Sequence, residues 1–441
     1  MTHHSPLAQK HFRRNWVAFF GDYVSFGLGL AFASMTTVLP AFAAALTDNK
    51  ILIGAVSSVW AGGWLLPQVF AANYLSNKPR KYPIMMWGEI LVRPVFPLFV
   101  LWMALGGVRF PLLTLLLFML MLAVFAASDA LVALAWLDML GKALAPETRG
   151  RLIGIAQVAT GVAALGVGAL IRYLLSAEGP AFPTNYTIIF GLASLCFFIS
   201  LASCALIVEP YEAVEDARPS LRDYFPQLAR LWRADAAFSR VTLVRLLSGL
   251  GGLATTFYVV YATDVLNMPA SAIGVFTAAA TLGTAIAGLA LGVAADRWGS
   301  QRVVQITTWV HFGVPVFALL ASSGVFGPAL PQLYPLLYVL LGIFEGSIML
   351  GFLNFILEIS PPGQRPTYMG LTNTLSGLLV FVPMVGGFLL ERTSYPTLFA
   401  LAAAGTLAGA VLALKLPNPR QGRAEAPAPA PQSGPHTSPA P

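Results

Sequence analysis

The chain has 441 residues, of which 57% are hydrophobic and only 10% are charged. Soluble domains carry about 25% charged residues, so this composition excludes an ordinary water-soluble enzyme, a disordered protein and a disulfide-rich secreted module. The net charge of +7 could suit nucleic acid, but the basic residues lie in short clusters between apolar segments. That arrangement favours loops facing an anionic membrane surface, and no nucleic-acid partner is expected.

Apolar segments long enough to cross a membrane recur along the chain. They predict an all-α integral membrane protein with twelve transmembrane helices in two six-helix halves. The predicted spans are 17–45, 52–75, 82–106, 111–138, 151–175, 185–208, 238–263, 271–294, 302–323, 333–358, 367–390 and 396–415.

One long polar stretch separates the first six spans from the last six. We expect an N-terminal tail at 1–16, a bundle at 17–208, a loop at 209–237, a second bundle at 238–416 and a disordered Pro/Ala-rich tail at 417–441. Apolar residues at helical spacing in the loop predict an amphipathic helix on the membrane surface; they are Leu221, Phe225, Leu228, Leu231 and Trp232.

Lys and Arg residues are distributed unevenly between the two predicted sides. With the N-terminus inside, 20 of the 26 basic residues fall in cytoplasmic segments and two lie within spans. The four in outside loops are Lys50, Arg109, Arg172 and Arg392. The excess of positive charge inside predicts that both termini are cytoplasmic.

The two predicted halves share a weak internal repeat. Ile53-Gly54 recurs as Ile273-Gly274 at an offset of 220. At an offset of 216, Gly161 corresponds to Gly377 and Asp129 to Glu345. Matches in chain order indicate two homologous halves, an arrangement found among secondary transporters.

The loop after the eighth predicted span reads G-V-A-A-D-R-W-G-S-Q-R over residues 292–302. It resembles the G-x-x-x-D-R-x-G-x-x-R signature of the major facilitator superfamily. We expect Gly292 and Gly299 to permit close helix approach and a tight turn, and Asp296 to accept a hydrogen bond from Arg297 or a helix N-terminus. Arg302 completes the motif.

The equivalent stretch of the first half keeps Arg80 and Lys81 but has Ser76 where the signature has an acid. This copy is therefore degenerate. Two further groups resemble the charged latches at the cytoplasmic helix ends of the family. Arg149 follows the fourth span, and Glu358 precedes Arg365 after the tenth. Interfacial anchoring is the alternative role for these residues.

The resemblance covers residues 16–416 and implies the twelve-helix fold, with helices one, four, seven and ten lining a central cavity. The G-G-W-L-L-P-Q stretch at 62–68, preceded by Leu39-Pro40, resembles a poorly characterised bacterial branch of the family. We therefore expect a monomer in the inner membrane of a bacterium, surrounded by lipid. The same stretch places Trp60, Trp64 and Gln68 near a proline kink.

Ionisable residues inside the spans are informative because each costs at least ~2.5–3.5 kcal/mol when it faces lipid. The helices that the resemblance places around the cavity carry one charge each. These charges are Asp22, Asp129, Arg245 and Glu345. We expect Glu345 and Asp129 to relay protons or contact substrate, and Asp22 and Arg245 either to gate the cavity or to form a structural salt bridge.

Other intramembrane polar residues have simpler explanations. Glu89 and Arg93 are four residues apart and can pair on one helix face, which we favour over a substrate role. His311 is expected to be a hydrogen-bonded packing residue, and Cys196 and Cys204 cannot form a disulfide on one helix. Candidate substrate contacts are Ser25, Thr36, Trp136, Tyr258, Tyr261 and Asn354.

The sequence thus predicts a secondary transporter of a small molecule. It contains no phosphate-binding loop for ATP, and we expect no cofactor and no metal. The four cavity charges sum to −2, which favours proton-coupled export of a cationic or neutral compound. An importer of a sugar or other metabolite by proton symport is the main alternative, and a lipid flippase or membrane enzyme is the alternative from another class.

Overall fold

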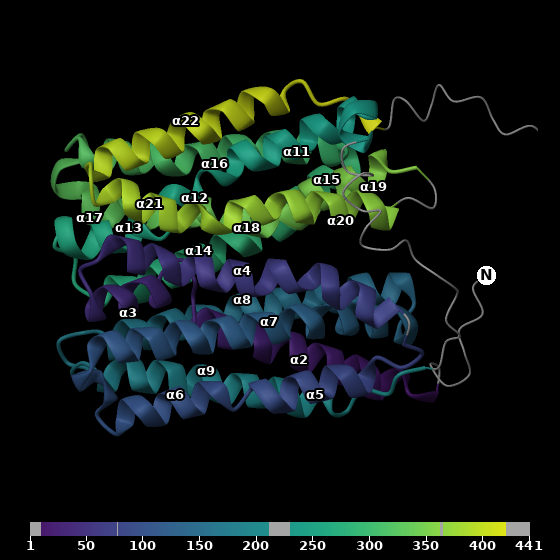
Figure 1. The fold of residues 1–441 in the computed structure, drawn as a ribbon, viewed down its shortest axis with the longest axis horizontal. Helices are drawn as coiled ribbons and strands as arrows, with labels where there is room; N and C mark the ends of the chain where they lie inside the picture. Colours follow the sequence, from purple (N-terminus) through teal and green to yellow (C-terminus); the bar gives the residue numbers. More distant parts are fainter. Residues whose placement is uncertain (1–9, 77, 211–229, 362–364, 420–441) are drawn as a thin grey trace, which may run out of the picture.

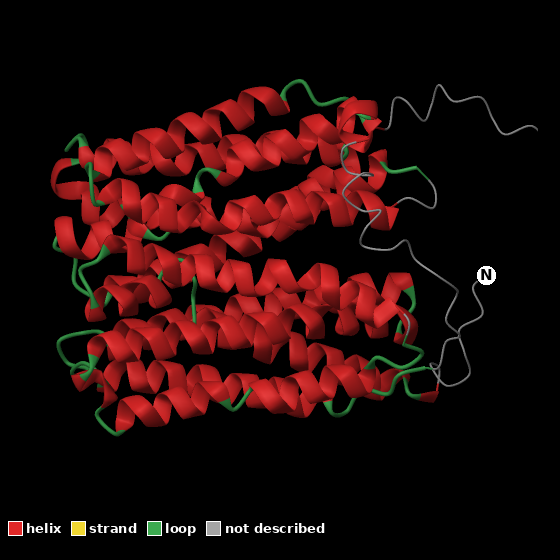
Figure 2. Cartoon of the chain, viewed as in Figure 1, coloured by secondary structure: helices red, strands yellow, loops and turns green. Residues whose placement is uncertain are grey.

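The computed structural model describes residues 10–76, 78–210, 230–361 and 365–419. Within them the chain consists of helices joined by loops (Figure 2). The amphipathic helix expected near 221–232 lies largely outside these residues, as do most of the two expected tails. The helices of the first half are α2 (Phe12–Phe32), α3 (Val38–Leu46), α4 (Lys50–Ser76), α5 (Tyr82–Val92), α6 (Val95–Ala104), η1 (Gly107–Arg109), α7 (Pro111–Ala143), α8 (Pro146–Leu174) and α9 (Thr184–Cys204).

The second half repeats this up-and-down order, with π-helical segments inserted in three spans (η2, η3 and η5). Its elements are α11 (Ala236–Gly249), α12 (Gly252–Thr255), α13 (Phe257–Val260), η2 (Tyr261–Val265), α14 (Ala272–Ile286), η3 (Ala287–Leu291), α15 (Gly292–Trp298), α16 (Ser300–Ser322), η4 (Gly327–Ala329), α17 (Leu330–Leu333), α18 (Pro335–Ile348), η5 (Met349–Leu353), α19 (Asn354–Ile359), α20 (Arg365–Ser376), η6 (Gly377–Phe381), α21 (Val382–Leu390) and α22 (Tyr395–Ala413).

Eleven helical segments of the described chain are long and apolar enough to cross a membrane, and they coincide with predicted spans two to twelve. The first predicted span supplies the twelfth through α2 and α3, which Asn15 and Asp22 make less apolar. The twelve-helix fold is therefore confirmed. The spans lie along a common axis and alternate in direction (Figure 1). We call the end of the bundle where α2 begins and α22 ends the terminal end, and the opposite end the distal end.

Three predicted spans are interrupted, where we expected continuous helices. The first breaks between α2 and α3, because Pro40 lacks the N–H that would bond the carbonyl of Thr36. The third breaks at Arg93 and Pro94. The seventh breaks after Gly249, at a run of glycines that lowers helix stability.

The repeated glycines form two equivalent seams between the halves. A Cβ atom at Gly54 of α4 would collide with the backbone of Pro383 in α21. A Cβ atom at Gly274 of α14 would collide with the backbone of α8 at Gly168 and Arg172. The repeat seen in the sequence therefore marks where the backbones of the two halves touch, α4 on α21 and α8 on α14 (Figure 1).

Five hydrogen bonds join the two halves among the described residues, and all lie towards the distal end. Two are related by the repeat: the Thr37 and Thr277 hydroxyls are 2.7 Å apart, and the Thr256 hydroxyl donates to Ser57 at 2.9 Å. The backbone N–H of Met384 donates to the Ser58 hydroxyl.

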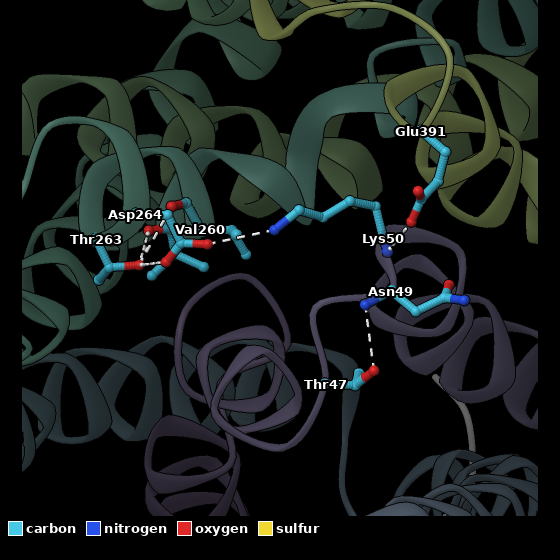
Figure 3. A network of polar contacts seen from close by, with 8 residues as sticks. Thr47, Asn49, Lys50, Val260, Thr263, Asp264 and Glu391 are labelled. Atoms are coloured by element: carbon cyan, nitrogen blue, oxygen red, sulfur yellow. Dashed lines mark hydrogen bonds and ion pairs between the residues drawn. The ribbon is translucent and has the colours of Figure 1, made fainter.

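The last two of these bonds both involve Lys50 (Figure 3). Its ammonium group donates to the carboxylate of Asp264 at 3.3 Å. Its backbone N–H donates to Glu391 at 2.6 Å, so a carboxylate of the second half caps the N-terminus of α4. The halves are thus fastened to each other at the distal end.

Candidate functional site

A cavity of about 550 Å³ lies between the halves, on the terminal side of the distal hydrogen bonds. The first half supplies its ionisable and aromatic wall. The second half supplies only Thr281, Thr284 and Ala285 of α14 and Met349 of η5. The lining residues of the first half that carry charge or a ring are Asp22, Tyr23, Phe26, Trp60, Trp64, Glu89, Arg93, Asp129 and Trp136.

Glu89 and Arg93 form the strongest ionic contact in the cavity wall. The guanidinium group donates two hydrogen bonds to the Glu89 carboxylate, through Nε and, at 2.6 Å, through Nη2. Both residues are buried, with 2% and 4% of their surface exposed. The predicted i,i+4 pairing is confirmed, but the pair lines the cavity and is therefore more than a structural contact within one helix.

Aromatic rings surround the guanidinium group of Arg93. Its Cζ atom lies 4.9–5.2 Å from the ring centroids of Phe26, Phe125 and Phe197. The faces of aromatic rings attract a cation, and excluding water strengthens the ion pair that remains. Arg93 directly precedes Pro94, at the break of the third span between α5 and α6.

Asp22 and Asp129 approach the same cavity from α2 and α7. Asp22 is buried and accepts a hydrogen bond of 2.6 Å from the Ser200 hydroxyl of α9. Asp129 is partly exposed to the cavity. A further void of about 10 Å³, close to the size that one water molecule needs, separates Asp129 and Ser128 from Glu89 and Arg93.

The structure divides the four predicted cavity charges into two groups. Asp22 and Asp129 line the cavity, whereas Arg245 and Glu345 do not. Three carboxylates and one guanidinium group face the cavity, because Glu89 and Arg93 replace Glu345 and Arg245. The formal sum is again −2 with all groups ionised.

Glu345 lies on α18, one helical turn before the lining residue Met349 and on the same face. It is exposed, and no described residue pairs with it. Arg245 is half-buried on α11. In the described chain no ion pair joins it to Asp22, whose carboxylate accepts from Ser200 instead.

Of the six candidate substrate contacts, Trp136 lines the cavity, and so do Trp60 and Trp64, which were expected only near the proline kink. The indole N–H of Trp136 is buried, and no described side chain or backbone group accepts from it. His311 stacks on Phe344 and its Nδ1 lacks a described partner, so the expected hydrogen bond is wrong and packing alone holds the ring. The other candidates lie outside the cavity lining; they are Ser25, Thr36, Tyr258, Tyr261 and Asn354.

The loop motif at 292–302 forms the tight turn predicted for it. Gly299 has φ of +84°, which only glycine adopts readily, and it joins α15 to α16. The close approach expected at Gly292 is wrong, because no described atom lies within 4 Å of a Cβ added there. Asp296 and Arg297 are exposed, and Arg302 donates to Gln305 at 3.1 Å.

Both candidate latch residues whose side chains are described contact the start or end of a helix. Glu358 accepts a hydrogen bond of 2.6 Å from Ser300, the first residue of α16, and so joins the tenth span to the loop motif. Arg149 donates to the carbonyls of Gly141 and Leu144 at the end of α7, where a cation is favoured. The side chain of Arg365 lies outside the described residues.

The first half contains a charge cluster at its terminal end that sequence reasoning missed. Asp138 of α7 bridges Lys81 at 2.6 Å and Lys142 at 2.7 Å. Glu209 accepts from the backbone N–H groups of Lys81 and Tyr82 at the start of α5. The cluster thus brings carboxylates to the degenerate motif, which lacks the acid of the signature.

Comparison with protein-family models finds a match in the second half of the chain. A model of the Major Facilitator Superfamily matches residues 241–440, the half that carries the intact loop motif. The second half of the chain therefore resembles this superfamily. The match indicates a transporter and not an enzyme. No curated protein matches the sequence.

Solved structures extend the likeness to both halves. The nucleoside transporter NupG is 14% identical with a TM-score of 0.63, and the match covers 91% of this chain and 99% of that one. A D-xylose-proton symporter is 13% identical with a TM-score of 0.65, over 95% and 99% of the two chains. A bacterial homologue of the iron transporter ferroportin, in an inward-facing state, is 15% identical with a TM-score of 0.65, over 92% and 98%. At these identities the matches show the fold of the transporter.

Proposed function

We propose that this transporter works by alternating access as a proton-coupled exporter of a cationic or neutral compound. The observation that carries the proposal is the cavity between the halves, which contains three carboxylates, one guanidinium group and a wall of aromatic rings. We propose further that the terminal end faces the cytoplasm of a bacterium and that the transporter acts as a monomer in the inner membrane.

Alternating access is supported by where the halves are fastened. The hydrogen bonds between them lie towards the distal end, while the cavity reaches Asp22 and Trp136 on the terminal side. With the terminal end in the cytoplasm, the structure represents the conformation closed to the outside. Rocking of one half on the other along the α4–α21 and α8–α14 seams would then open the distal end.

Proton coupling is supported by Asp129 and Glu345, which correspond in the two halves. Asp129 faces the cavity, and Glu345 lies one turn from it on the opposite wall. A carboxyl group that gains and loses a proton as its surroundings open and close can link a proton gradient to substrate movement. Asp22 and Arg245 remain the proposed gate residues in the conformation that is open to the outside.

A cationic substrate is supported by the charge and the rings of the cavity wall. The carboxylates outnumber the guanidinium group, and Trp60, Trp64 and Trp136 supply aromatic rings, whose faces attract cations. Export of such a compound would use proton entry to displace the cation from the acids. The buried indole N–H of Trp136 offers one further hydrogen bond to a substrate acceptor.

The test is transport by purified protein in liposomes under an imposed proton gradient. Thermal unfolding with a panel of lipophilic cations, sugars, amino acids and organic anions first selects the substrate. We expect Asp129→Asn and Glu345→Gln to abolish gradient-driven transport while substrate exchange without a gradient persists. Asp48→Asn, an exposed acid outside the cavity, is the control. Full active transport by both cavity variants contradicts the proposal.

Import of a sugar or nucleoside by proton symport is the second candidate. The uncharged polar lining supports it, since Gln157 and Thr160 of α8 and Thr281 and Thr284 of α14 offer amide and hydroxyl groups to a polyhydroxylated substrate. Tryptophan rings also stack on sugars and bases. Stabilisation by a sugar or nucleoside alone, with uptake towards the terminal end, would favour this candidate over export.

A further inference from the structure

A second large hollow, separate from the transport cavity, lies at the distal end of the α8–α14 seam. This groove has a volume of about 720 Å³ and shares no lining residue with the cavity. Leu165 and Ala169 of α8 form one flank, and Val275 and Ala278 of α14 form the other. These side chains are exposed or half-buried, so the groove opens to the lipid-facing side of the helices.

Small residues make the floor of the groove. Gly168 and Gly274 bring the backbones of α8 and α14 into contact, so no side chain fills the space above them. The floor and flanks are therefore apolar along about one helical turn, from Leu165 to Ala169. An extended hydrocarbon chain has the shape and polarity of such a groove.

Polar and charged groups gather where α8 ends. Arg172 is two residues from the end of the helix, and Glu178 lies in the loop that follows. Both side chains are exposed, and neither forms an ion pair with any described residue. Tyr173, which is 55% exposed, is typical of the membrane–water interface.

The α4–α21 seam differs from the α8–α14 seam in the pairing of its charges. At the distal end of α4 and α21 the charges pair with protein groups: Lys50 with Asp264, and Glu391 with the start of α4 (Figure 3). At the distal end of the α8–α14 seam, Arg172 and Glu178 form no ion pair with any residue that the structure describes. A ligand that offers an anion and a cation would complete this seam as the protein completes the other.

We infer that the α8–α14 groove binds a phospholipid with a zwitterionic, amine-bearing headgroup from the outer leaflet. The phosphate would contact Arg172, the ammonium group would contact Glu178, and one acyl chain would lie over Gly168 and Gly274. Because both helices contribute, the lipid stabilises the conformation in which the distal end is closed. This site is distinct from the substrate cavity and does not depend on the identity of the substrate.

Thermal unfolding of the delipidated protein in detergent tests the inference, with phosphatidylethanolamine, phosphatidylcholine or phosphatidylglycerol added in turn. We expect a saturable rise in the unfolding midpoint that is largest with phosphatidylethanolamine. Arg172→Gln and Glu178→Gln should each weaken the apparent lipid affinity about tenfold, as expected when a charge-assisted contact is lost. Arg109→Gln, an exposed arginine at the same end but outside the groove, is the matched control.

A second variant separates lipid binding from any effect of removing charge. Ala169→Trp places a ring in the groove from an exposed position, so the protein should fold normally and lose the response to lipid. Equal responses to the three lipids overturn the headgroup assignment. An unchanged response in both Arg172→Gln and Ala169→Trp overturns the site itself. Neither result bears on the proposed transport activity, which is measured with substrate.

Discussion

The two halves of the transporter share their architecture but divide its chemistry. Both halves use the same glycine to touch the other half, Gly54 in one and Gly274 in the other. Only the first half places charges in the cavity wall, whereas the second contributes two threonines, an alanine and a methionine. In the described chain the π-helical segments, including the one that carries Met349, all belong to the second half.

This division means that rocking of the halves does not have to break the ion pair of the cavity. Glu89 and Arg93 lie one turn apart in the same span, and the rings around Arg93 belong to α2, α7 and α9 of the same half. The contacts that opening must break are the few hydrogen bonds at the distal end. The charged wall can therefore remain assembled in both conformations, while the uncharged wall moves past it.

The largest expected effect comes from leaving one charge of this wall without its partner. Arg93→Met leaves the buried Glu89 carboxylate unpaired, which typically costs about 3–5 kcal/mol. We expect a large fall in the unfolding midpoint of the purified protein and loss of transport. Arg245→Met in the second half should cost much less, because no described carboxylate is paired with Arg245.

The double variant Glu89→Leu/Arg93→Met sharpens this prediction. Removing both charges leaves no buried ion behind, so most of the stability should return while transport stays lost. If the double variant is as unstable as Arg93→Met alone, the aromatic packing around Arg93 matters more than the ion pair.

The next largest effect concerns the two glycine seams between the halves. A side chain at Gly54 or Gly274 must push apart two backbones, and such overpacking costs about 1–3 kcal/mol. We expect Gly54→Val and Gly274→Val to lower stability and transport by similar amounts, measured side by side. Gly166→Val on α8 is the control, since no described atom lies within 4 Å of a Cβ atom there. Unequal effects would show that the two seams are not equivalent.

The sequence predicted the features that depend on local patterns, but not those that depend on how the helices pack. The spans, the repeat and the turn at Gly299 depend on apolar length, on glycine and on local conformation, and all were predicted. Which residues line the cavity depends on how each helix is rotated about its axis and where it is interrupted. Asp22 and Asp129 were found because their helices line the cavity, but the third span was not expected to line it, so Glu89 and Arg93 were missed as wall residues.

The charge cluster of the first half was missed for a related reason. Its members Lys81, Asp138 and Glu209 are separated by 57 and 71 positions along the chain, and only the packing of three spans brings them together. Searching for the missing acid near Ser76 could not find a carboxylate supplied by α7.

The smallest expected effect tests whether the distal end opens symmetrically. Thr37→Val and Thr256→Val each remove one hydroxyl hydrogen bond between the halves, worth about 1 kcal/mol. Each substitution should shift the equilibrium about fivefold towards the conformation open at the distal end, because only the closed conformation makes the bond. Stability of the folded protein should change little.

Labelling of a single cysteine measures this shift. Thr281→Cys, in protein whose Cys196 and Cys204 are replaced by serine, places the thiol in the cavity wall. An impermeant maleimide added from the distal side should react about five times faster in each valine variant and about 25 times faster in the double variant, since the two bonds are separate. A faster reaction in Thr37→Val alone would mean that α3 moves by itself. The second half would then serve as a fixed wall, and the opening at the distal end would not follow the symmetry of the seams.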